Sequence, residues 1–490
     1  MHLLGIDLGS SSVKVSVMNA ENGQCLASTF YPKVEAEIIS GQDGWAEQHP
    51  EIWYEQTCMA LTDLEFDLST IDAIGISYQM HGLVAVDRNG QVLRPAIIWC
   101  DDRAVEIGEK SFHELGEEYC LNNLLNSPGN FTATKLKWVQ ENEPELYARI
   151  HKIMLPGDYL AYRLSGEMNT TKSGLSEGVF WNFKEEAIDE RLLKNLNINP
   201  AKIADLVPTF GLQAKVSQEA SRETGIKKGI PITYRAGDQP NNAWSLNVLS
   251  PGEVAATAGT SGVVYGLTDQ KSFDPKSRVN SFLHVNHQKD HPRIGVLMCI
   301  NSTGILNSWL RQNVSNGLTY DEMNQLAMTV SEGSEGLLIL PFGNGAERVL
   351  ENKNIGVSIH HLNLLKHTQA HLIRAAHEGL AFSFAYGMEI MKTTGVETSL
   401  IRACKANMFL SPILRETLST LTGATIELYD TDGALGAARG AGMGIGYYKS
   451  REAAFMSLKV LERITPNPTK ETLYKEAYEE WKRILQLNIS

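Results

Sequence analysis

The order of apolar and polar residues changes repeatedly between strand-like and helix-like spacing along this chain. Residues 3–8 form a short apolar run and residues 13–17 alternate strictly, so the Gly/Ser turn between them predicts a β-hairpin. Further elements are expected at residues 71–77 and 92–99 as strands, and at residues 131–142, 372–391 and 473–487 as helices. Because strands and helices are mixed from end to end, the pattern indicates an α/β or α+β class.

The last of these expected helices carries a clear apolar stripe. Leu473, Ala477, Trp481, Ile484 and Leu485 recur at helical spacing. Such a stripe is typical of a helix that docks on a domain through one face. We therefore expect these five side chains to form the docking face of a terminal helix.

Length and composition narrow the possible classes of protein. A chain of 490 residues exceeds one hydrophobic core, which predicts two large domains or three smaller ones. The net charge of −13, without any run of Lys or Arg, argues against binding to nucleic acid or to an anionic membrane. Six cysteines without CxxC spacing indicate free thiols in a reducing cytoplasm rather than disulfides or zinc. Neither a signal peptide nor an apolar stretch of about 18 residues is present, so a cytoplasmic location is expected.

One short segment recurs about half a chain later. Residues 9–15 (GSSSVKV) resemble residues 259–265 (GTSGVVY), and each segment follows an apolar run and precedes an alternating one. The recurrence suggests two related halves, each with a hydroxyl-lined turn. Two such turns facing each other across a cleft would form a site for a polyanion.

The first of these turns, with the aspartate before it, is a candidate for phosphate and metal binding. A Gly/Ser turn between strands exposes backbone N–H groups that bind phosphate oxygens, and glycine permits close approach. Asp7 stands two residues earlier and can hold Mg²⁺ directly or through water, because Mg²⁺ needs few carboxylates. Thr257 occupies the place in the second turn that Asp7 occupies in the first. A cleft between the turns would then hold one metal-binding carboxylate and two phosphate-binding turns, which suits one nucleotide triphosphate better than two metals. The alternative is a tight hairpin with a solvent-facing Asp7; no GxxxxGK[ST] motif supports a P-loop fold.

Two further polar residues stand at expected strand ends. In IPITYRAGDQPNNAW, Asp238 follows an apolar run and could accept a proton from a substrate hydroxyl. The alternative is a turn aspartate that caps a helix beginning at Pro240. His81, in YQMHGLVAVDRNG, stands in a similar position before Gly82, and a purely structural role is the alternative for it.

Together these segments resemble the FGGY carbohydrate kinases, which belong to the superfamily of actin-like sugar kinases and heat-shock ATPases. The resemblance runs almost from end to end and is carried by GIDLGSS at 5–11, WAEQ at 45–48 with Pro50, QMHG at 79–82, LRPAIIW at 93–99 with Asp101 and Arg103, LPGDYL at 155–160, Gly237-Asp238, GTSG at 259–262, LPF at 340–342 with Gly345, Glu347 and Arg348, and GALGAA at 433–438. Any one segment is weak, whereas their shared order and spacing are specific.

The resemblance implies a fold and a set of residue roles. The implied fold is α/β, with two actin-like (ribonuclease H-like) ATPase domains at residues 1–245 and 246–490 and a ligand cleft between them. The implied roles are Asp238 as catalytic base, Asp7 as a catalytic residue that binds Mg²⁺ through water, Gln79, Met80, His81, Trp99 and Asp238 as sugar contacts, Gly9, Ser10, Ser11, Gly259, Thr260 and Ser261 as phosphate contacts, and Cys404 and Asn407 as further nucleotide contacts.

The implied reaction is the phosphorylation of a sugar by ATP with Mg²⁺. The QMHG segment has the form of family members that act on D-xylulose, so the expected products are D-xylulose 5-phosphate and ADP. Another sugar or polyol, such as L-ribulose, L-xylulose or glycerol, is an alternative, as is a non-catalytic actin-like nucleotide sensor. The chain departs from the family where residues 401–409 lack glycine and where Cys100 replaces the commoner Asn. Because relatives are often dimers, a homodimer is a further expectation.

Overall fold

The expected hairpin begins a six-stranded sheet. The computed structural model describes residues 1–489, and its first strands are β1 (His2–Leu8) and β2 (Val13–Asn19), paired antiparallel. The sheet has the order β13-β14-β5-β1-β2-β3 and is completed by β3 (Cys25–Tyr31), β5 (Ile71–Tyr78), β13 (Phe210–Lys215) and β14 (Pro231–Gly237). β5 runs parallel to β1 and β14 parallel to β5, whereas β3 and β13 are antiparallel to their neighbours.

A second sheet repeats this arrangement. Its order is β17-β18-β16-β15-β21-β22-β23, with β15 (Glu253–Ala258), β16 (Gly262–Thr268), β17 (Asn280–Leu283), β18 (Ile294–Ile300), β21 (Leu400–Cys404), β22 (Thr425–Tyr429) and β23 (Glu462–Ile464). The hairpin β15–β16 continues antiparallel into β18, and β21 and β22 follow β15 in parallel, as β5 and β14 follow β1. The sequence recurrence therefore marks two halves that share the order and directions of five strands, β3-β2-β1-β5-β14 in one and β18-β16-β15-β21-β22 in the other.

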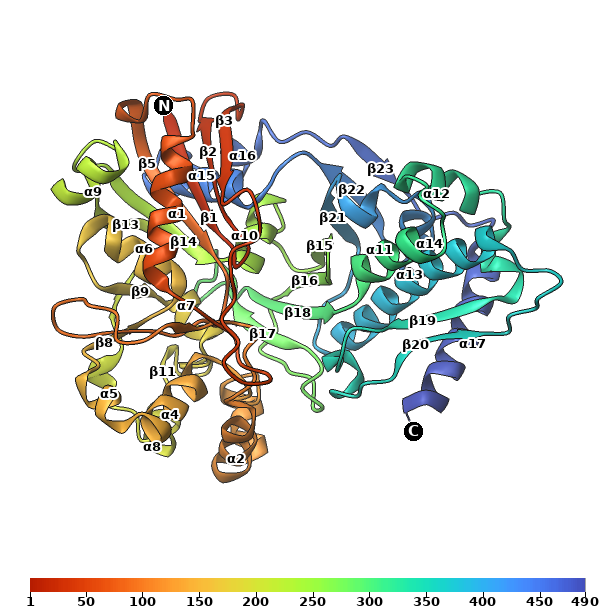
Figure 1. Cartoon of the computed structure of the whole chain (residues 1–490), viewed down its shortest axis with the longest axis horizontal. Helices are drawn as coiled ribbons and strands as arrows, with labels where there is room; N and C mark the ends of the chain where they lie inside the picture. The colour runs from red at the N-terminus through yellow and green to blue at the C-terminus, as the bar shows by residue number, and fades with distance from the viewer. Residues whose placement is uncertain (490) are drawn as a thin grey trace. The chain divides into compact units, whose positions relative to one another are not determined.

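The chain forms two units, each built around one of these sheets (Figure 1). Unit 1 comprises Met1–Asn247, Phe282–Arg293 and Thr431–Leu458, and unit 2 comprises Val248–Ser281, Ile294–Asp430 and the stretch from Lys459. The expected domains, residues 1–245 and 246–490, were each one continuous stretch, whereas each unit combines several stretches. The expected domain bounds stay a prediction.

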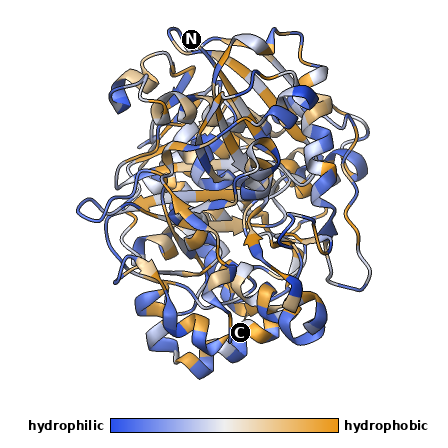
Figure 2. Cartoon of the chain, turned by 90° about the vertical axis from the view of Figure 1, so that its left-hand side faces the viewer, coloured by the Kyte–Doolittle hydropathy of each residue, from blue (hydrophilic) through white to orange (hydrophobic). Residues whose placement is uncertain are grey.

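The other elements of unit 1 are helices and short strands around its sheet. They are β4 (Glu47–Gln48), α1 (Pro50–Thr62), β6 (Val84–Val86), β7 (Ala96–Ile97), α2 (Val105–Leu115), α3 (Glu117–Asn123), α4 (Thr132–Asn142), α5 (Pro144–Arg149), β8 (Lys152–Met154), α6 (Pro156–Ser165), β9 (Asn169–Thr171), α7 (Lys172–Glu177), β10 (Trp181–Asn182), β11 (Ala187–Ile188), α8 (Glu190–Asn195), β12 (Asp205–Val207), α9 (Gln218–Thr224), α10 (Asp238–Ser245), α15 (Gly433–Gly444) and α16 (Arg451–Phe455). The central strands of this unit are largely apolar and its outlying loops largely polar (Figure 2).

Helix α15 joins unit 1 from far along the chain and lies directly on its sheet. A methyl group added at Gly5 would lie 1.7 Å from the Ala434 carbonyl oxygen, and one at Gly75 would lie 1.9 Å from that of Ala437. Glycine on β1 and β5 therefore lets the helix backbone touch the strands. This close packing places the N-terminus of α15 beside the carboxyl end of β1.

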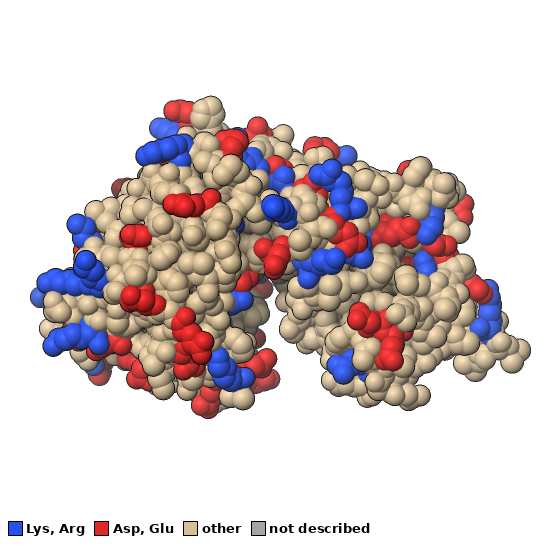
Figure 3. Space-filling model, turned by 90° about the horizontal axis from the view of Figure 1, so that it is seen from above, with Lys and Arg blue, Asp and Glu red and all other residues tan. Residues whose placement is uncertain are grey.

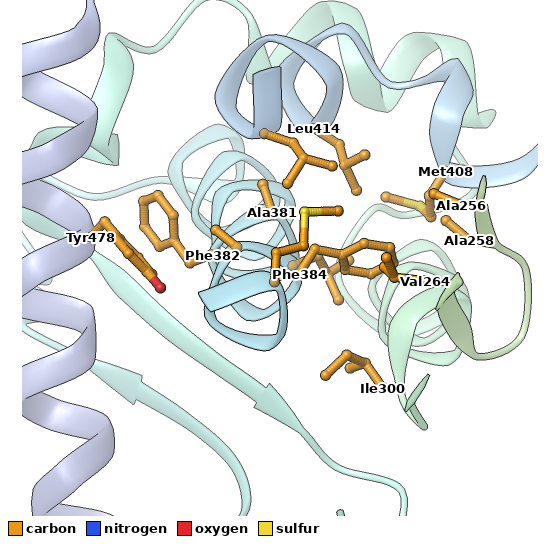
Figure 4. Close-up of a cluster of buried hydrophobic side chains, with 14 of the residues drawn as sticks. Ala256, Ala258, Val264, Ile300, Ala381, Phe382, Phe384, Met408, Leu414 and Tyr478 are labelled. Carbon is orange, nitrogen blue, oxygen red and sulfur yellow. The ribbon is translucent and has the colours of Figure 1, made fainter. Parts of the chain in front are cut away.

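The expected helix at residues 372–391 is the centre of the unit 2 core. It is α13 (Gln369–Thr393), and around it lie α11 (Thr303–Asn313), α12 (Tyr320–Ala327), β19 (Leu338–Phe342), β20 (Gly356–His360), α14 (Pro412–Thr422) and α17 (Glu471–Ile489). Figure 4 shows Phe384 of α13 directed toward Val264 of the sheet and Phe382 directed toward Tyr478 of α17. One long helix thus buries apolar side chains against a sheet and a terminal helix.

The docking face of α17 differs in part from the expected one. Trp481, Ile484 and Leu485 are buried, but Leu473 is 43% exposed, and Tyr474 and Tyr478 supply the buried positions instead. An aromatic side chain covers more of the facing surface than Ala477 can. The stripe was therefore predicted correctly at its C-terminal end and wrongly at its first position.

The expected strand at residues 92–99 is mostly absent. Only β7 (Ala96–Ile97) forms there, with two isolated bridges, Val86 to Val92 and Leu83 to Ile97. Pro95 lacks the N–H that a continuous ladder requires, which accounts for the interruption.

The distribution of charge and the state of the cysteines agree with the composition. Acidic and basic side chains are interspersed over the face that Figure 3 shows. All six cysteines are free thiols. Among residues 1–489, no helix is long and apolar enough to cross a membrane.

Candidate functional site

The carboxylate predicted to act as a base lies where strand β14 passes into helix α10. β14 ends at Gly237 and α10 begins at Asp238, so the helix starts at this residue rather than at Pro240. Asp238 is partly exposed at the end of the strand. Burial, together with the negative charge of Asp7, raises the pKa of Asp238 to about 7. A carboxyl with this pKa accepts a proton more readily than an ordinary aspartate does.

Asp7 lies at the end of β1, beside the N-terminus of α15. A methyl group on Gly433 would lie 2.1 Å from Asp7 Oδ2, so the carboxylate fits only because the helix begins with glycine. Lys14 is the register partner of Asp7 across the hairpin, and its Nζ lies 2.6 Å from Asp432 Oδ2. Burial raises the pKa of Asp7, and the Asp432 charge adds to this, while the Ser77 hydroxyl and Lys14 oppose it.

The first Gly/Ser turn is held in shape by hydrogen bonds from other parts of unit 1. The Gly9 N–H donates to the Ser12 carbonyl at 3.0 Å, and the Ala36 N–H donates to the Ser11 carbonyl at 2.8 Å. The Gln48 side-chain amide donates to the Ser10 carbonyl at 2.7 Å. Because its carbonyls bond to protein donors, the turn keeps one conformation while Ser11 stays exposed.

The segment after β5 lies next to Asp238. Gln79 and Met80 are buried, and a methyl group added at Gly237 would lie 2.6 Å from Met80 Cγ. His81 has a φ of 61°, an uncommon conformation for a residue with a side chain. The structure therefore brings three of the predicted sugar contacts to the turn that carries the predicted base.

The His81 ring is oriented by its neighbours. Its Nδ1 lies 2.8 Å from the Glu177 carbonyl oxygen, which can only accept, so Nδ1 carries the proton of this hydrogen bond. The ring packs against Phe131 and Phe282, with centroid distances of 4.9 and 5.3 Å. The Glu177 carbonyl and the two phenylalanine rings thus set the orientation of the His81 ring.

Trp99 lies on a segment that Lys135 ties to the His81 turn. The Lys135 ammonium donates to the carbonyls of His81 at 3.1 Å and Ile98 at 2.8 Å. Burial lowers the pKa of Lys135 to about 8. Trp99 itself is 51% exposed, and its contact with a sugar stays a prediction.

In unit 2 the second Gly/Ser turn connects β15 and β16. The Gly304 N–H, at the start of α11, donates to the Thr260 carbonyl at 3.0 Å. A methyl group added at Gly259 would lie 3.6 Å from Asn407 Nδ2, so this predicted nucleotide contact lies beside the turn. Cys404 ends β21, and its carbonyl accepts from the Ala406 N–H at 2.8 Å. The roles of Ser261, Cys404 and Asn407 toward a nucleotide stay predictions.

His377 was not predicted, yet it connects the segments that carry the unit 2 candidates. Its Nδ1 lies 2.9 Å from Ser411 Oγ, and its Nε2 lies 3.0 Å from Asn307 Oδ1. Ser411 follows the short helix that begins at Asn407, and Asn307 lies on α11. Burial and the charge of Arg374 lower the pKa of His377 to about 4, so the ring is neutral at pH 7. The local sequence around His377, one of two histidines in α13, gave no signal for this role.

Glu177 is the second residue that sequence analysis missed. It ends α7, is 1% exposed, and lies against the Gly237–Asp238 turn. A glutamate in KSGLSE resembles an ordinary surface residue of a helix, and nothing in the local pattern predicts that it is buried.

Comparisons with known proteins agree with this arrangement. Two family models match: the N-terminal domain of the FGGY family of carbohydrate kinases over residues 2–243, and its C-terminal domain over residues 254–445. A xylulose kinase of Lactococcus lactis is 29% identical over 508 residues, covering 99% of this chain and 96% of that protein.

Solved structures show the same fold. A ligand-bound xylulose kinase of Lactobacillus acidophilus superimposes with a TM-score of 0.89 at 22% identity, covering 99% of this chain and 98% of that one. A gluconate kinase of the same organism gives a TM-score of 0.89 at 21% identity, covering 100% and 98%. The fold is thus shared by enzymes whose names carry different substrates.

Proposed function

Because the chain belongs to the FGGY family of carbohydrate kinases, we propose that it transfers the γ-phosphoryl group of ATP to D-xylulose. The products are D-xylulose 5-phosphate and ADP. The end-to-end similarity to a xylulose kinase supports this substrate. The observation that carries the proposal is the position of Asp238, whose carboxyl has a pKa of about 7. Asp238 follows Gly237, on which Met80 and Glu177 pack. The Glu177 carbonyl in turn accepts a hydrogen bond from His81.

In the proposed reaction, Asp238 acts as the general base. Its carboxylate orients the primary hydroxyl of the sugar and takes its proton as the oxygen attacks the γ-phosphorus. The new O–P bond forms while the bond from the γ-phosphorus to the bridging oxygen breaks, and ADP leaves with that electron pair. Met80 and His81 hold the sugar, so that its hydroxyl meets the base in one orientation.

The donor set around Asp7 fits a hydrated Mg²⁺. Among residues 1–489 no group of three or more His, Cys, Asp or Glu side chains could hold a metal ion. Mg²⁺ typically uses one or two carboxylates, several waters and substrate phosphates. Burial and the negative charge of Asp7 raise the pKa of Asp238, and a bound cation would relieve the repulsion between the two carboxylates. When bound, Mg²⁺ would neutralise charge on the phosphates, and Asp7 would orient one of its waters.

A panel of ketoses and polyols with Mg²⁺ and ATP tests the proposed substrate. ADP release is measured for D-xylulose, L-xylulose, L-ribulose, glycerol and gluconate. We expect D-xylulose to give the largest kcat/KM, by about tenfold or more, because a site that hydrogen-bonds particular hydroxyls rejects stereoisomers strongly. A larger value for another acceptor would replace the substrate and keep the kinase class, whereas no acceptor-dependent ADP release would overturn the proposal.

Replacing Asp7 with Asn tests its assignment to the metal. The substitution keeps the shape and removes the charge that favours a hydrated cation, so half-saturation by Mg²⁺ should rise by about tenfold. The measurement is a magnesium titration of ADP release at fixed sugar and ATP. Asp102→Asn, far along the chain from β1 and without a predicted role, is the control. An unchanged titration for the Asp7 variant would remove Asp7 from the metal site.

A further inference from the structure

The Glu177 carboxyl touches both segments of the proposed sugar site in unit 1. A methyl group added at Gly237 would lie 2.2 Å from Glu177 Oε2, so the carboxyl oxygen packs directly on the residue before Asp238. The same methyl group would lie 2.6 Å from Met80 Cγ, so Met80 also packs on Gly237, beside the Glu177 carboxyl. Glycine is therefore the only residue type small enough at position 237 to leave room for both side chains.

The main chain of Glu177 bonds to a second predicted sugar contact, His81. Its carbonyl oxygen accepts the hydrogen bond from His81 Nδ1 at 2.8 Å. The His81 ring is thereby oriented by the same residue whose side chain packs on the Asp238 turn. Glu177, at the end of α7, therefore contacts the residue before the proposed base and is bonded to His81, and its carboxyl lies beside Met80.

The surroundings of the Glu177 carboxyl indicate that it acts without a charge. Burial raises the pKa of Glu177 well above its ordinary value, and the negative charges of Asp238 and Asp158 raise it further, while the Tyr78 hydroxyl and the His81 amide oppose the shift. Glu177 is 1% exposed, and among residues 1–489 no Lys, Arg or His forms an ion pair with its carboxyl. A neutral carboxyl at this place does not repel the ionised Asp238.

We propose that Glu177 is a positioning residue that holds the turn carrying the catalytic base against the sugar-binding turn. Its carboxyl packs beside Met80 on Gly237, and its carbonyl accepts the hydrogen bond that orients the His81 ring. The inference rests on the proposed function, because it takes Asp238 as the base. What matters in it is the length and shape of the side chain, not its charge.

Two conservative substitutions separate length from charge. Glu177→Gln keeps the length and is neutral, so its kcat/KM for D-xylulose should stay within about threefold of the parent. Glu177→Asp keeps the carboxyl but withdraws it by one methylene, so kcat/KM for D-xylulose should fall by about tenfold or more, because misplacement by about 1 Å costs up to 10²-fold. KM for ATP should change by less than about twofold in both variants.

Leu175→Val provides the matched control. It also shortens a buried side chain of α7 by one carbon, and Leu175 lines a small cavity with Ile153 and Ile203 rather than the Gly237 contact. We expect its kcat/KM for D-xylulose to stay within about twofold of the parent. Melting temperatures of all three variants show whether each is folded at the assay temperature.

The outcomes distinguish this inference from the proposed function. If Glu177→Asp matches the parent or the Leu175→Val control, or if Glu177→Gln loses as much as Glu177→Asp, Glu177 is not a positioning residue of the kind inferred. An equal rise of KM for ATP and for sugar would also overturn it. Asp238→Asn is assayed in parallel: activity retained there contradicts the proposed base, whereas its loss together with a parental Glu177→Asp contradicts only the inference.

Discussion

Replacing Asp238 with Asn is expected to lower kcat by about 10³-fold, within the range that a positioned general base contributes. Asparagine keeps the size of the side chain and its place in the first turn of α10, but it cannot take the hydroxyl proton. Sugar and ATP should still bind, so KM for each should change by less than about threefold. The measurement is sugar-dependent ADP release with Mg²⁺ and ATP, using the best acceptor of the panel.

The pH dependence of the parent enzyme gives an independent check on the same residue. With the pKa of Asp238 at about 7, the carboxylate is the major form above pH 7 and the protonated acid is the major form below it. The base is therefore lost as pH falls, and kcat/KM for the sugar should decrease by about tenfold per pH unit below this value. Retention of turnover within about tenfold of the parent in Asp238→Asn, with an unchanged acid limb, would remove this residue from the role of base.

Replacing Asp158 with Asn is expected to lower the free energy of unfolding of unit 1 by about 3–5 kcal/mol, as breaking a buried ion pair does. Asp158 is 1% exposed and Arg235 is fully buried on β14, two residues before Gly237. Arg235 Nε lies 2.8 Å from Asp158 Oδ1, and Arg235 Nη2 donates to Asn169 Oδ1 at 2.8 Å. In the parent, burial raises the pKa of Asp158 and the charge of Arg235 opposes this shift. In the Asp158→Asn variant, the buried arginine would lack the negative charge that pairs with it.

Chemical denaturation, monitored by the fluorescence of the tryptophans, measures this loss. Asp205→Asn is the matched control, because Asp205 forms an exposed pair with Lys152 at 4.0 Å and its side chain is 94% exposed. An exposed pair contributes about 0–1 kcal/mol, so the control should remain close to the parent. If both variants lose the same stability, the buried pair does not support the strand that carries the proposed base.

Local periodicity was sufficient for the elements that form by neighbour contacts. The hairpin β1–β2, strand β5, helix α13 and the C-terminal part of α17 were predicted from spacing alone, because period-2 and period-3.6 patterns record which face is buried. The strand expected at residues 92–99 failed at Pro95, where the ladder needs an N–H.

The recurrence of GSSSVKV in GTSGVVY was also informative. It predicted two related halves, and the two sheets share the order and directions of five strands. Motif order along the chain then indicated the family, because many weak segments in one order are specific together. The roles of Asp238, Met80 and His81 followed from that order and not from their local patterns, which fit structural roles equally well.

The amino-acid sequence thus established the periodic elements, the repeated architecture and the family. It did not establish which distant side chains meet at the site, because contacts such as Glu177 with Gly237 or Lys14 with Asp432 join positions that local spacing does not relate. It also did not establish their charges, because a carboxyl takes its pKa from burial and neighbouring charges, which exist only once the chain is folded. Folding therefore raised the pKa values of an ordinary glutamate and an ordinary aspartate, which we propose to be a neutral positioning residue and the catalytic base.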